Sequence, residues 1–163
     1  MKLSRKAGII LLVVLNIAID QISKVIVRQT INPGERIPVI DDIFILMNVE
    51  NTGAFLGMGS DMNQTLKLIF LLILPIGVLG YLIYYILTNK SLDKVSKAAF
   101  SCIAGGGIAN VFDRIAYGSV TDFFYLDIGG IFHTGIFNVA DMSVTFGMIA
   151  LLYSSFFLNR NNK

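Results

Sequence analysis

Two aspartates, Asp122 and Asp141, lie where polar sequence meets strongly apolar sequence. Asp122 follows an apolar run that ends at Asp113-Arg114, and Asp141 stands in Asn138-Val139-Ala140-Asp141, at the start of another such run. Ionisable side chains next to hydrocarbon are energetically costly, so they commonly mark functional sites. Two neighbouring carboxylates do not easily ionise together, so one can hold a proton while the other is a base. Such a pair can activate water against an amide bond and protonate the leaving nitrogen.

The chain offers little for other kinds of catalysis. Its one cysteine, Cys102, and its one histidine, His133, fall toward opposite ends of the predicted helices, with roughly 21 Å of helix between Cys102 and Ala116. They cannot pair for thiol chemistry, and we interpret Cys102 as a packing residue and His133 as an exposed loop residue. One histidine leaves no ligand set for zinc or haem, and one cysteine leaves no intrachain disulfide. No metal or organic cofactor is expected.

The composition indicates an integral membrane protein. Of the 163 residues, 55% are hydrophobic and only 15% are charged, and the mean hydropathy is +0.71. A soluble domain is close to half apolar, with about a quarter of its residues charged. The net charge of +2 is small and the basic residues do not form one patch, so no nucleic-acid partner is expected.

Four apolar runs are long enough to cross a bilayer, at residues 7–27, 66–87, 98–116 and 136–158. The first would measure roughly 31 Å as a helix. No small-residue cleavage site follows it, so it is interpreted as an uncleaved span and not as a signal peptide. We therefore predict an all-α membrane protein, with a four-transmembrane-helix bundle that makes residues 1–163 a single integral membrane domain.

Charge places the two ends of the helices on opposite sides of the membrane. Basic residues flank the side that holds both termini, which predicts that this side is cytoplasmic. Ten of the eleven acids fall on the other side, and Asp93 is the exception. The extracytoplasmic segments are 28–65 and 117–135, and residues 37–49 are rich enough in Ile, Val and Phe to predict one or two strands. The flanking basic residues are Lys2, Arg5, Lys6, Lys90, Lys94, Lys97, Arg160 and Lys163.

Helical spacing brings more polar side chains to the same end as the two acids. Positions three, four or seven residues apart share one face of a helix, so three helices each present a polar face there. The short 117–135 loop would let Asp122 fold back over Asp141. The three faces hold Asp20 and Lys24; Gly106, Asn110, Asp113 and Arg114; and Asn138, Asp141 and Thr145.

Several of these residues also have a purely structural interpretation. Asp20 and Lys24 fit an i, i+4 ion pair near an interface. Asp113-Arg114 fits either an anchor at a helix end or a support for the site. Asn51 fits an ordinary turn residue, and Asp127 a solvated loop acid.

Five short motifs, taken together and in order, resemble the bacterial lipoprotein signal peptidase (signal peptidase II) family over the whole chain. Each motif alone is weak, and their order on the expected helices makes the resemblance specific. Thr121, where a second valine is common, and the absence of proline from 133–137 depart from the family pattern. The motifs are Asp20-Gln21-Ile22-Ser23-Lys24, Asn51-Thr52-Gly53-Ala54-Phe55, Asn110-Val111-Phe112-Asp113-Arg114, Val120-Thr121-Asp122-Phe123 and Phe137-Asn138-Val139-Ala140-Asp141.

The resemblance implies a set of roles for these residues. It implies an aspartic endopeptidase with Asp122 and Asp141 as the catalytic dyad. It further implies that four residues line the site, bind substrate or orient the dyad, and that Asp20 and Lys24 give structural support. The four lining residues are Asn51, Asn110, Arg114 and Asn138.

The resemblance also implies a location, partners and accessory elements. Such enzymes lie in the bacterial cytoplasmic (inner) membrane, among membrane lipids, with both termini cytoplasmic and the site at the outer face. Their substrates are prolipoproteins, cut just before a cysteine that carries a diacylglyceryl group. The cyclic peptide antibiotic globomycin blocks them, and the chain is expected to act as a monomer. A β-rich cradle within 31–59 and a mobile, helix-containing lid within 117–135 are also implied.

Two interpretations from other classes remain alongside this one. The first is a proton-coupled transporter or channel subunit that uses Asp20, Asp113 and Asp141 as a relay. The crowding of acids at one face, with no ionisable steps in the other halves of the helices, argues against a complete path. The second is a structural membrane scaffold, which leaves the acidic cluster unexplained.

Overall fold

Four long helices form the body of the molecule. The computed structural model describes residues 4–54 and 58–158, so Lys2, Phe55, Arg160 and Lys163 from the charge and motif arguments lie outside the described residues. Each of the four helical stretches is long and apolar enough to cross a membrane. The helices are α1 (Arg5–Thr30), α2 (Gln64–Lys67), η2 (Leu68–Ile73) and α3 (Leu74–Thr88) in one continuous span, α4 (Lys94–Tyr117), and α5 (Val139–Tyr153), which continues into η3 (Ser154–Leu158).

Two helices begin three or four residues away from the start of the predicted apolar run, because polar side chains cap them. The Asp93 side chain accepts the backbone N–H groups of Val95 and Ser96 at 2.8 and 2.9 Å, so α4 begins at Lys94 and not near 98. Asn138 caps α5 by accepting the N–H of Asp141 at 2.9 Å, so α5 begins at Val139 and not near 136. Apolar runs do not resolve such starts, since capping depends on single polar residues.

The helix α4 is central, because small residues let α1 and α5 approach it closely. A Cβ atom on Gly105 would lie 2.9 Å from the backbone oxygen of Val13 in α1. A Cβ on Gly106 would lie 2.4 Å from the backbone oxygen of Ala140 in α5. Close helix contacts through small residues are typical of membrane proteins, where lipid offers no hydrophobic drive for association. These two glycines therefore set the spacing of three helices.

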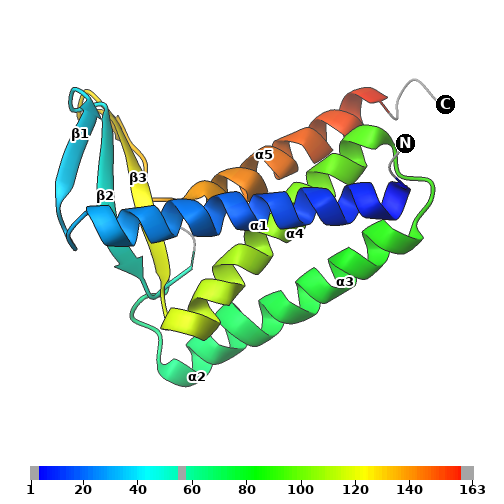
Figure 1. Cartoon of the computed structure of the whole chain (residues 1–163), viewed down its shortest axis with the longest axis horizontal. Coiled ribbons are helices and arrows are strands. Elements are labelled where there is room, and N and C mark those ends of the chain that lie inside the picture. The colour runs from blue at the N-terminus through cyan, green and yellow to red at the C-terminus, as the bar shows by residue number, and fades with distance from the viewer. Residues whose placement is uncertain (1–3, 55–57, 159–163) are drawn as a thin grey trace.

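A small antiparallel sheet lies across one end of the bundle, and the first turn of α1 and the helix η3 lie at the other (Figure 1). We refer to these as the sheet end and the tail end. The sheet is seated on α1 through a core of Val27, Ile31 and Phe123. Its strands, in spatial order, are β1 (Arg36–Ile40), β2 (Phe44–Asn51), β3 (Val120–Ile128) and β4 (Phe132–His133).

The prediction of a helix-containing lid within 117–135 is wrong. The structure describes this whole segment, and beyond the last residue of α4 it holds β3, a turn and β4, with no further helix. Its sequence, Val120–Ile128, is rich in the β-branched and aromatic residues that favour strands. Strand β3 pairs with β2 in a register that sets Asp122 opposite Val49 and Val120 opposite Asn51. Asp122 is therefore held in a strand of the sheet, and not delivered by a loop.

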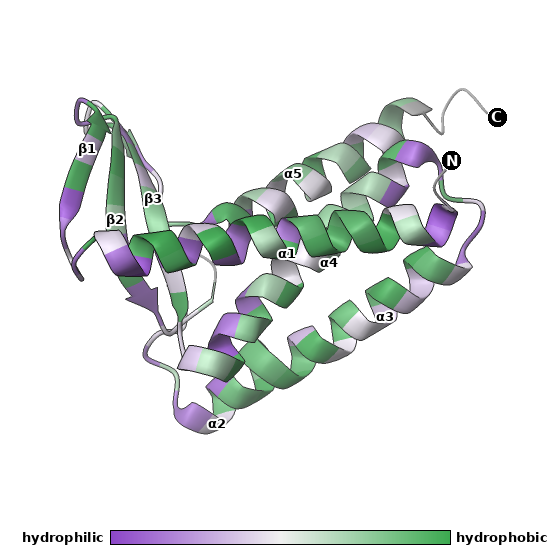
Figure 2. Ribbon diagram, in the orientation of Figure 1, coloured by the Kyte–Doolittle hydropathy of each residue, from purple (hydrophilic) through white to green (hydrophobic). Residues whose placement is uncertain are grey.

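The hydropathy of the residues changes along the length of the bundle. Apolar residues cover the middle of α1 and α3, whereas polar residues gather in α2, in parts of the sheet and toward the helix ends (Figure 2). At the tail end, Arg5 donates to the backbone oxygens of Ile86 and Leu87 at 2.7 and 3.1 Å, which ties the start of α1 to the last turn of α3. An apolar band between two polar ends is the pattern of a bilayer-spanning bundle.

Candidate active site

Asp122 and Asp141 border one cavity of about 200 Å³ at the sheet end. We call it the dyad cavity. Asp122 comes from β3, and Asp141 from the first turn of α5. The predicted pair therefore lines one cavity, although residue 122 was predicted to lie in a loop and α5 was predicted to begin at residue 136. The cavity is also lined by Asn51, Ala54, Leu71, Gly107, Asn110, Arg114 and Val120.

The Asp122 carboxylate is only 2% exposed and accepts two amide donors. Asn51 Nδ2 donates to its Oδ2 at 2.8 Å, and Asn138 Nδ2 donates to its Oδ1 at 2.6 Å. Burial raises the pKa of Asp122 to about 7, because the charged form loses its hydration. The hydrogen bonds from Asn51 oppose this rise in the pKa, and the negative charge of Asp141 adds to it. Asp122 can therefore hold a proton near neutral pH.

The Asp141 carboxylate is held in the same way, with one donor on each oxygen. Asn110 Nδ2 donates to its Oδ1 at 2.9 Å, and the backbone N–H of Asn138 donates to its Oδ2 at 3.1 Å. The second contact completes a capping box, in which Asn138 and Asp141 satisfy each other's backbone N–H groups. The same two residues thus start the helix and fix the orientation of the acid.

Lys24 and Asn138 determine which way the amides of the site point. A lysine ammonium only donates hydrogen bonds. Lys24 Nζ lies 2.9 Å from Asn110 Oδ1, so the Asn110 oxygen must face α1 and its Nδ2 must face Asp141. Asn138 Oδ1 accepts the N–H of Asp141, which leaves Asn138 Nδ2 to bridge Asp122 and Asn110 Oδ1 at 2.6 and 3.2 Å. A chain of amides therefore joins the two carboxylates.

Lys24 also binds two acids in the interior of the bundle. Its Nζ lies 2.7 Å from Asp20 and 2.8 Å from Asp113, and all three side chains are fully buried. Asp20 in turn accepts the backbone N–H of Ala140 in the first turn of α5 at 2.8 Å. The i, i+4 pair predicted for Asp20 and Lys24 is present, and it is buried where it links three helices. Asp113 is likewise buried, in the last turns of α4.

Arg114 and Asn51 fix the segment that follows β2. Arg114 Nη2 donates to the backbone oxygen of Gly53 at 2.8 Å, and Nη1 to that of Asn110 at 3.2 Å. Asn51 accepts the N–H of Gly53 at 2.8 Å, so it is a turn residue as well as a partner of Asp122. Asn51 is therefore a turn residue, as one interpretation predicted, and its role in the site stays a prediction that its contact with Asp122 is consistent with. The Arg114 guanidinium brings a positive charge to the wall of the dyad cavity.

A polar cluster beside the site was not predicted. Gln21 Nε2 donates to Asp113 at 2.9 Å. Arg28 Nε donates to Thr121 Oγ1 at 2.7 Å, and Thr121 donates to Glu50 at 2.8 Å. The position of Arg28, four residues after Lys24 and eight after Asp20, was the available sequence signal, because all three fall on one helix face.

The remaining candidates lie apart from the dyad cavity. His133 is exposed in β4, and Cys102 packs beside Asn16, whose amide lies 3.9 Å from its sulfur. Asp127 accepts the N–H of Gly130 in the β3–β4 turn. Within residues 4–54 and 58–158, no group of three or more His, Cys, Asp or Glu side chains could hold a metal ion.

Known proteins are similar in sequence to this chain over most of its length. Residues 12–157 match the family model described as signal peptidase (SPase) II. A lipoprotein signal peptidase of Clostridium tetani is 34% identical over 143 residues, which are 88% of this chain and 88% of the relative. A lipoprotein signal peptidase of Borreliella burgdorferi is 37% identical over 146 residues, covering 86% of this chain and 85% of the relative.

Solved structures share the fold as well. A bacterial membrane enzyme determined by the in meso method at 2.3 Å resolution is 29% identical, with a TM-score of 0.82 over 96% of this chain and 92% of that chain. A second, determined in the same way at 1.9 Å resolution, is 28% identical, with a TM-score of 0.80 over 92% of this chain and 93% of the other. With its four bilayer-length helices, the protein is a multi-pass membrane protein. The chain belongs to the signal peptidase II family.

Proposed function

We propose that this protein is an aspartic endopeptidase of the bacterial cytoplasmic membrane. It removes the signal peptide from diacylglyceryl-modified prolipoproteins, just before the lipidated cysteine. The observation that carries the proposal is the pair of carboxylates, Asp122 and Asp141, on one small cavity, with an amide donor on each of their four oxygens. Family membership and the names of the relatives support the choice of substrate.

The dyad hydrolyses the amide bond with one shared proton. The ionised carboxylate takes a proton from a water molecule while the water oxygen bonds to the scissile carbonyl carbon. At the same time the protonated carboxyl gives its proton to the carbonyl oxygen. The carboxyl that took the water proton then passes it to the amide nitrogen. As the C–N bond breaks, a hydroxyl of the diol returns its proton to the other carboxylate. The products are a signal peptide acid and a free amine on the lipidated cysteine.

The surrounding residues hold the dyad in place. Asn51, Asn110 and Asn138 orient the two carboxylates. Lys24 sets the direction of the Asn110 amide, and Asp20 holds the first turn of α5, so both are positioning residues. Arg114 places a positive charge where the carbonyl oxygen of the substrate gains negative charge, which stabilises the transition state.

The orientation in the membrane follows from where the dyad lies. We place the sheet end at the outer face of the membrane and both termini in the cytoplasm. A lipidated cysteine keeps its acyl chains among the membrane lipids, so its scissile bond lies at the interface, level with the dyad cavity. The sheet is the cradle for the substrate, a globomycin-type cyclic peptide competes for the same cavity, and the protein works as a monomer.

Cleavage of a purified diacylglyceryl-modified prolipoprotein in detergent tests the dyad. Asp122→Asn and Asp141→Asn are each expected to lower kcat by at least about 100-fold, because a general acid or base commonly supplies that much. The matched control is Asp127→Asn, which is on the same strand as Asp122 but next to the β3–β4 turn, and it should keep wild-type turnover. Circular dichroism confirms that each variant is folded. Wild-type turnover in either dyad variant would contradict the assignment.

A further inference from the structure

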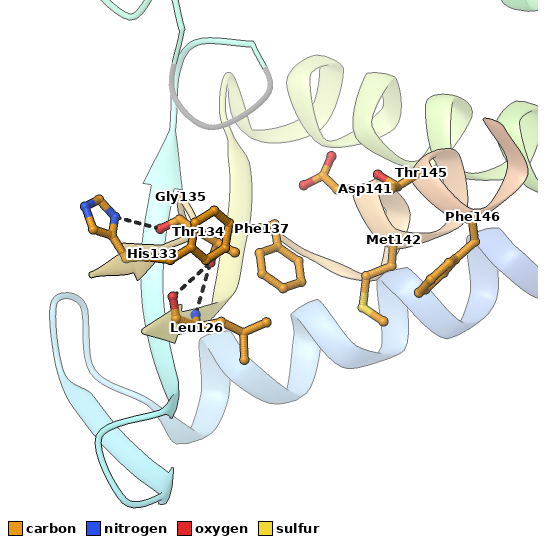
Figure 3. A pocket seen from close by; sticks show the side chains of 10 residues that line it. Leu126, His133, Thr134, Gly135, Phe137, Asp141, Met142, Thr145 and Phe146 are labelled. Carbon is orange, nitrogen blue, oxygen red and sulfur yellow. Dashed lines mark hydrogen bonds between the residues drawn. The ribbon is translucent and has the colours of Figure 1, made fainter. Parts of the chain in front are cut away.

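A second, larger cavity of about 540 Å³ begins at Asp141 and runs along the outer side of α5 (Figure 3). We call it the α5–β4 groove. Leu126, Phe137 and Met142 border it, and Phe132 and Phe146 stand at its edges with 62% and 60% of their surfaces exposed. The groove is therefore open to the side, at the level of the first two turns of a membrane-spanning helix.

Apart from Asp141 at its inner end and the Thr145 hydroxyl one turn further along α5, the groove offers almost no polar group. Thr134 Oγ1 is occupied, because it accepts the N–H of Leu126 at 3.0 Å, and the His133 ring turns away toward the backbone oxygen of Thr134 (Figure 3). A peptide in this groove would leave its own N–H and C=O groups unpaired, at a cost that hydrocarbon does not incur.

The cavities on the other side of the dyad hold many more polar side chains, although Leu68, Leu71 and Leu72 also line one of them. They border Asp122 and Arg114 and are lined by side chains that can satisfy a peptide backbone. A peptide therefore finds hydrogen-bond partners on one side of the dyad, and hydrocarbon finds almost purely apolar surroundings on the other. The polar side chains of those cavities are Glu50, Asn51, Thr52, Ser60, Gln64, Lys67 and Arg114.

We propose that the α5–β4 groove binds an acyl chain of the diacylglyceryl group. The inference rests on the proposed function and states where the lipid of the proposed substrate binds. The lipid is attached to the residue that directly follows the scissile bond, so its chains start within a few bonds of the dyad. The groove that starts at Asp141 is within reach of such a chain, and its open edge at Phe132 and Phe146 lets the chain come from the bilayer.

The test uses synthetic prolipoprotein peptides whose two acyl chains range from four to sixteen carbons. Each methylene that the groove buries contributes about 0.8 kcal/mol, or about fourfold in kcat/KM, so kcat/KM should rise with length and then level off. Thr145→Phe puts a ring into the groove one turn after Asp141. It should lower the ratio of kcat/KM for long chains to that for short chains at least tenfold. The matched control, Ile149→Phe, lies one turn further along α5 on an exposed site outside the groove and should keep the wild-type ratio.

The outcomes separate this inference from the proposed function. A wild-type protein that cleaves none of the lipidated peptides would overturn both. A wild-type protein that cleaves them, with an unchanged ratio in Thr145→Phe, would overturn the groove alone. A photoreactive diazirine at the end of one chain gives a readout without turnover, in the Asp122→Asn protein, where the groove is intact. Labelling of Phe132, Met142 or Phe146 supports the assignment, and labelling confined to Leu68 and Leu72 of the second span overturns it.

Discussion

The two carboxylates of the dyad are balanced between opposing effects. Burial disfavours the charge on Asp122, while Asn51 and Asn138 donate hydrogen bonds that favour it. The net result raises the pKa of Asp122 to about 7, close to the pH at which a general acid must still hold its proton and a base must still accept one. The amides therefore tune the acid as well as orient it.

This pKa predicts the pH dependence of the reaction. For the free enzyme, kcat/KM should fall as the pH rises through about 7, because the dyad then loses its shared proton. Cleavage of one lipidated peptide between pH 5 and about 9 measures this limb. Asp127→Asn, outside the dyad cavity, should leave the limb in place. A value of kcat/KM that stays constant across this range would contradict the raised pKa.

The same pKa has a consequence for stability, with a sign that can be checked. In the unfolded chain Asp122 ionises near its ordinary pKa of 3.8, whereas in the folded protein it keeps its proton to about pH 7. The folded state therefore loses stability as the pH rises between these values, by about 1.4 kcal/mol for each unit of pKa shift, and loses no more above them. Asp122→Asn lacks this loss, so the difference between its Tm and the wild-type Tm should shift in favour of the variant as the pH rises from 4 to about 7. A pH-independent difference in Tm would contradict the shift.

Single residues differ in how far the sequence predicts them. The proximity of Asp122 and Asp141 to one cavity was predicted, because both acids stand out beside apolar runs and the family motifs pair them. The i, i+4 spacing of Asp20 and Lys24 predicts their ion pair, but not its burial against Asp113. Burial depends on which helix faces meet, and spacing within one helix does not contain that information.

Among the elements, the contact of α4 with α5 at Gly106 decides where Asp141 lies. Gly106→Ala would place a Cβ 2.4 Å from the backbone oxygen of Ala140. The helix α5 then has to move away from α4, which moves Asp141 away from Asn110. Overpacking of this kind costs about 1–3 kcal/mol, and we expect a lower Tm and a fall in kcat of at least tenfold.

The control is the same substitution where space is free. In α3, a Cβ on Gly77 meets no atom within 4 Å, and alanine is the better helix former. Gly77→Ala should therefore keep wild-type kcat and lose no stability. Equal activity in Gly106→Ala and Gly77→Ala would mean that the close approach of α4 and α5 does not position the dyad.

The helices were easier to predict than the sheet. Four apolar runs identify four helices, and the Asn138-x-x-Asp141 spacing is a capping-box pattern that marks the start of α5. Strand β3 was missed as a strand because it follows α4 after only Gly118 and Ser119 and pairs with β2, about 70 residues earlier in the chain. The resemblance to the family predicted a lid in this segment, but its β-branched and aromatic residues form a strand.

At the scale of the whole molecule, the charges gather at one end and neutralise one another there. Lys24 binds both Asp20 and Asp113, two of the three acids that a proton relay would use. Acids held in ion pairs with a lysine are poor carriers of protons, because each transfer would leave the lysine unpaired in the interior. The arrangement therefore favours a fixed frame for the dyad over a path across the membrane.

The proposed orientation predicts which residues face which side of the membrane. In a Cys102→Ala background, Asp42→Cys lies in the exposed β1–β2 turn, and Lys90→Cys lies in the exposed α3–α4 turn. A membrane-impermeant maleimide added to intact bacterial cells with a permeable envelope should label the first and not the second. Lysis should make both reactive. The reverse pattern would place the dyad on the cytoplasmic side.

The open side of the α5–β4 groove implies that the enzyme binds its substrate from within the membrane plane. Phe132 and Phe146 border the exposed edge of the groove, which in the proposed orientation faces the bilayer. A lipid-bearing substrate then arrives by diffusion in a plane, and its relevant concentration is a surface density. Diluting vesicles with buffer leaves that density unchanged, whereas diluting the substrate with more phospholipid lowers it. The shape of one groove thus makes membrane area, and not solution volume, the quantity on which turnover depends.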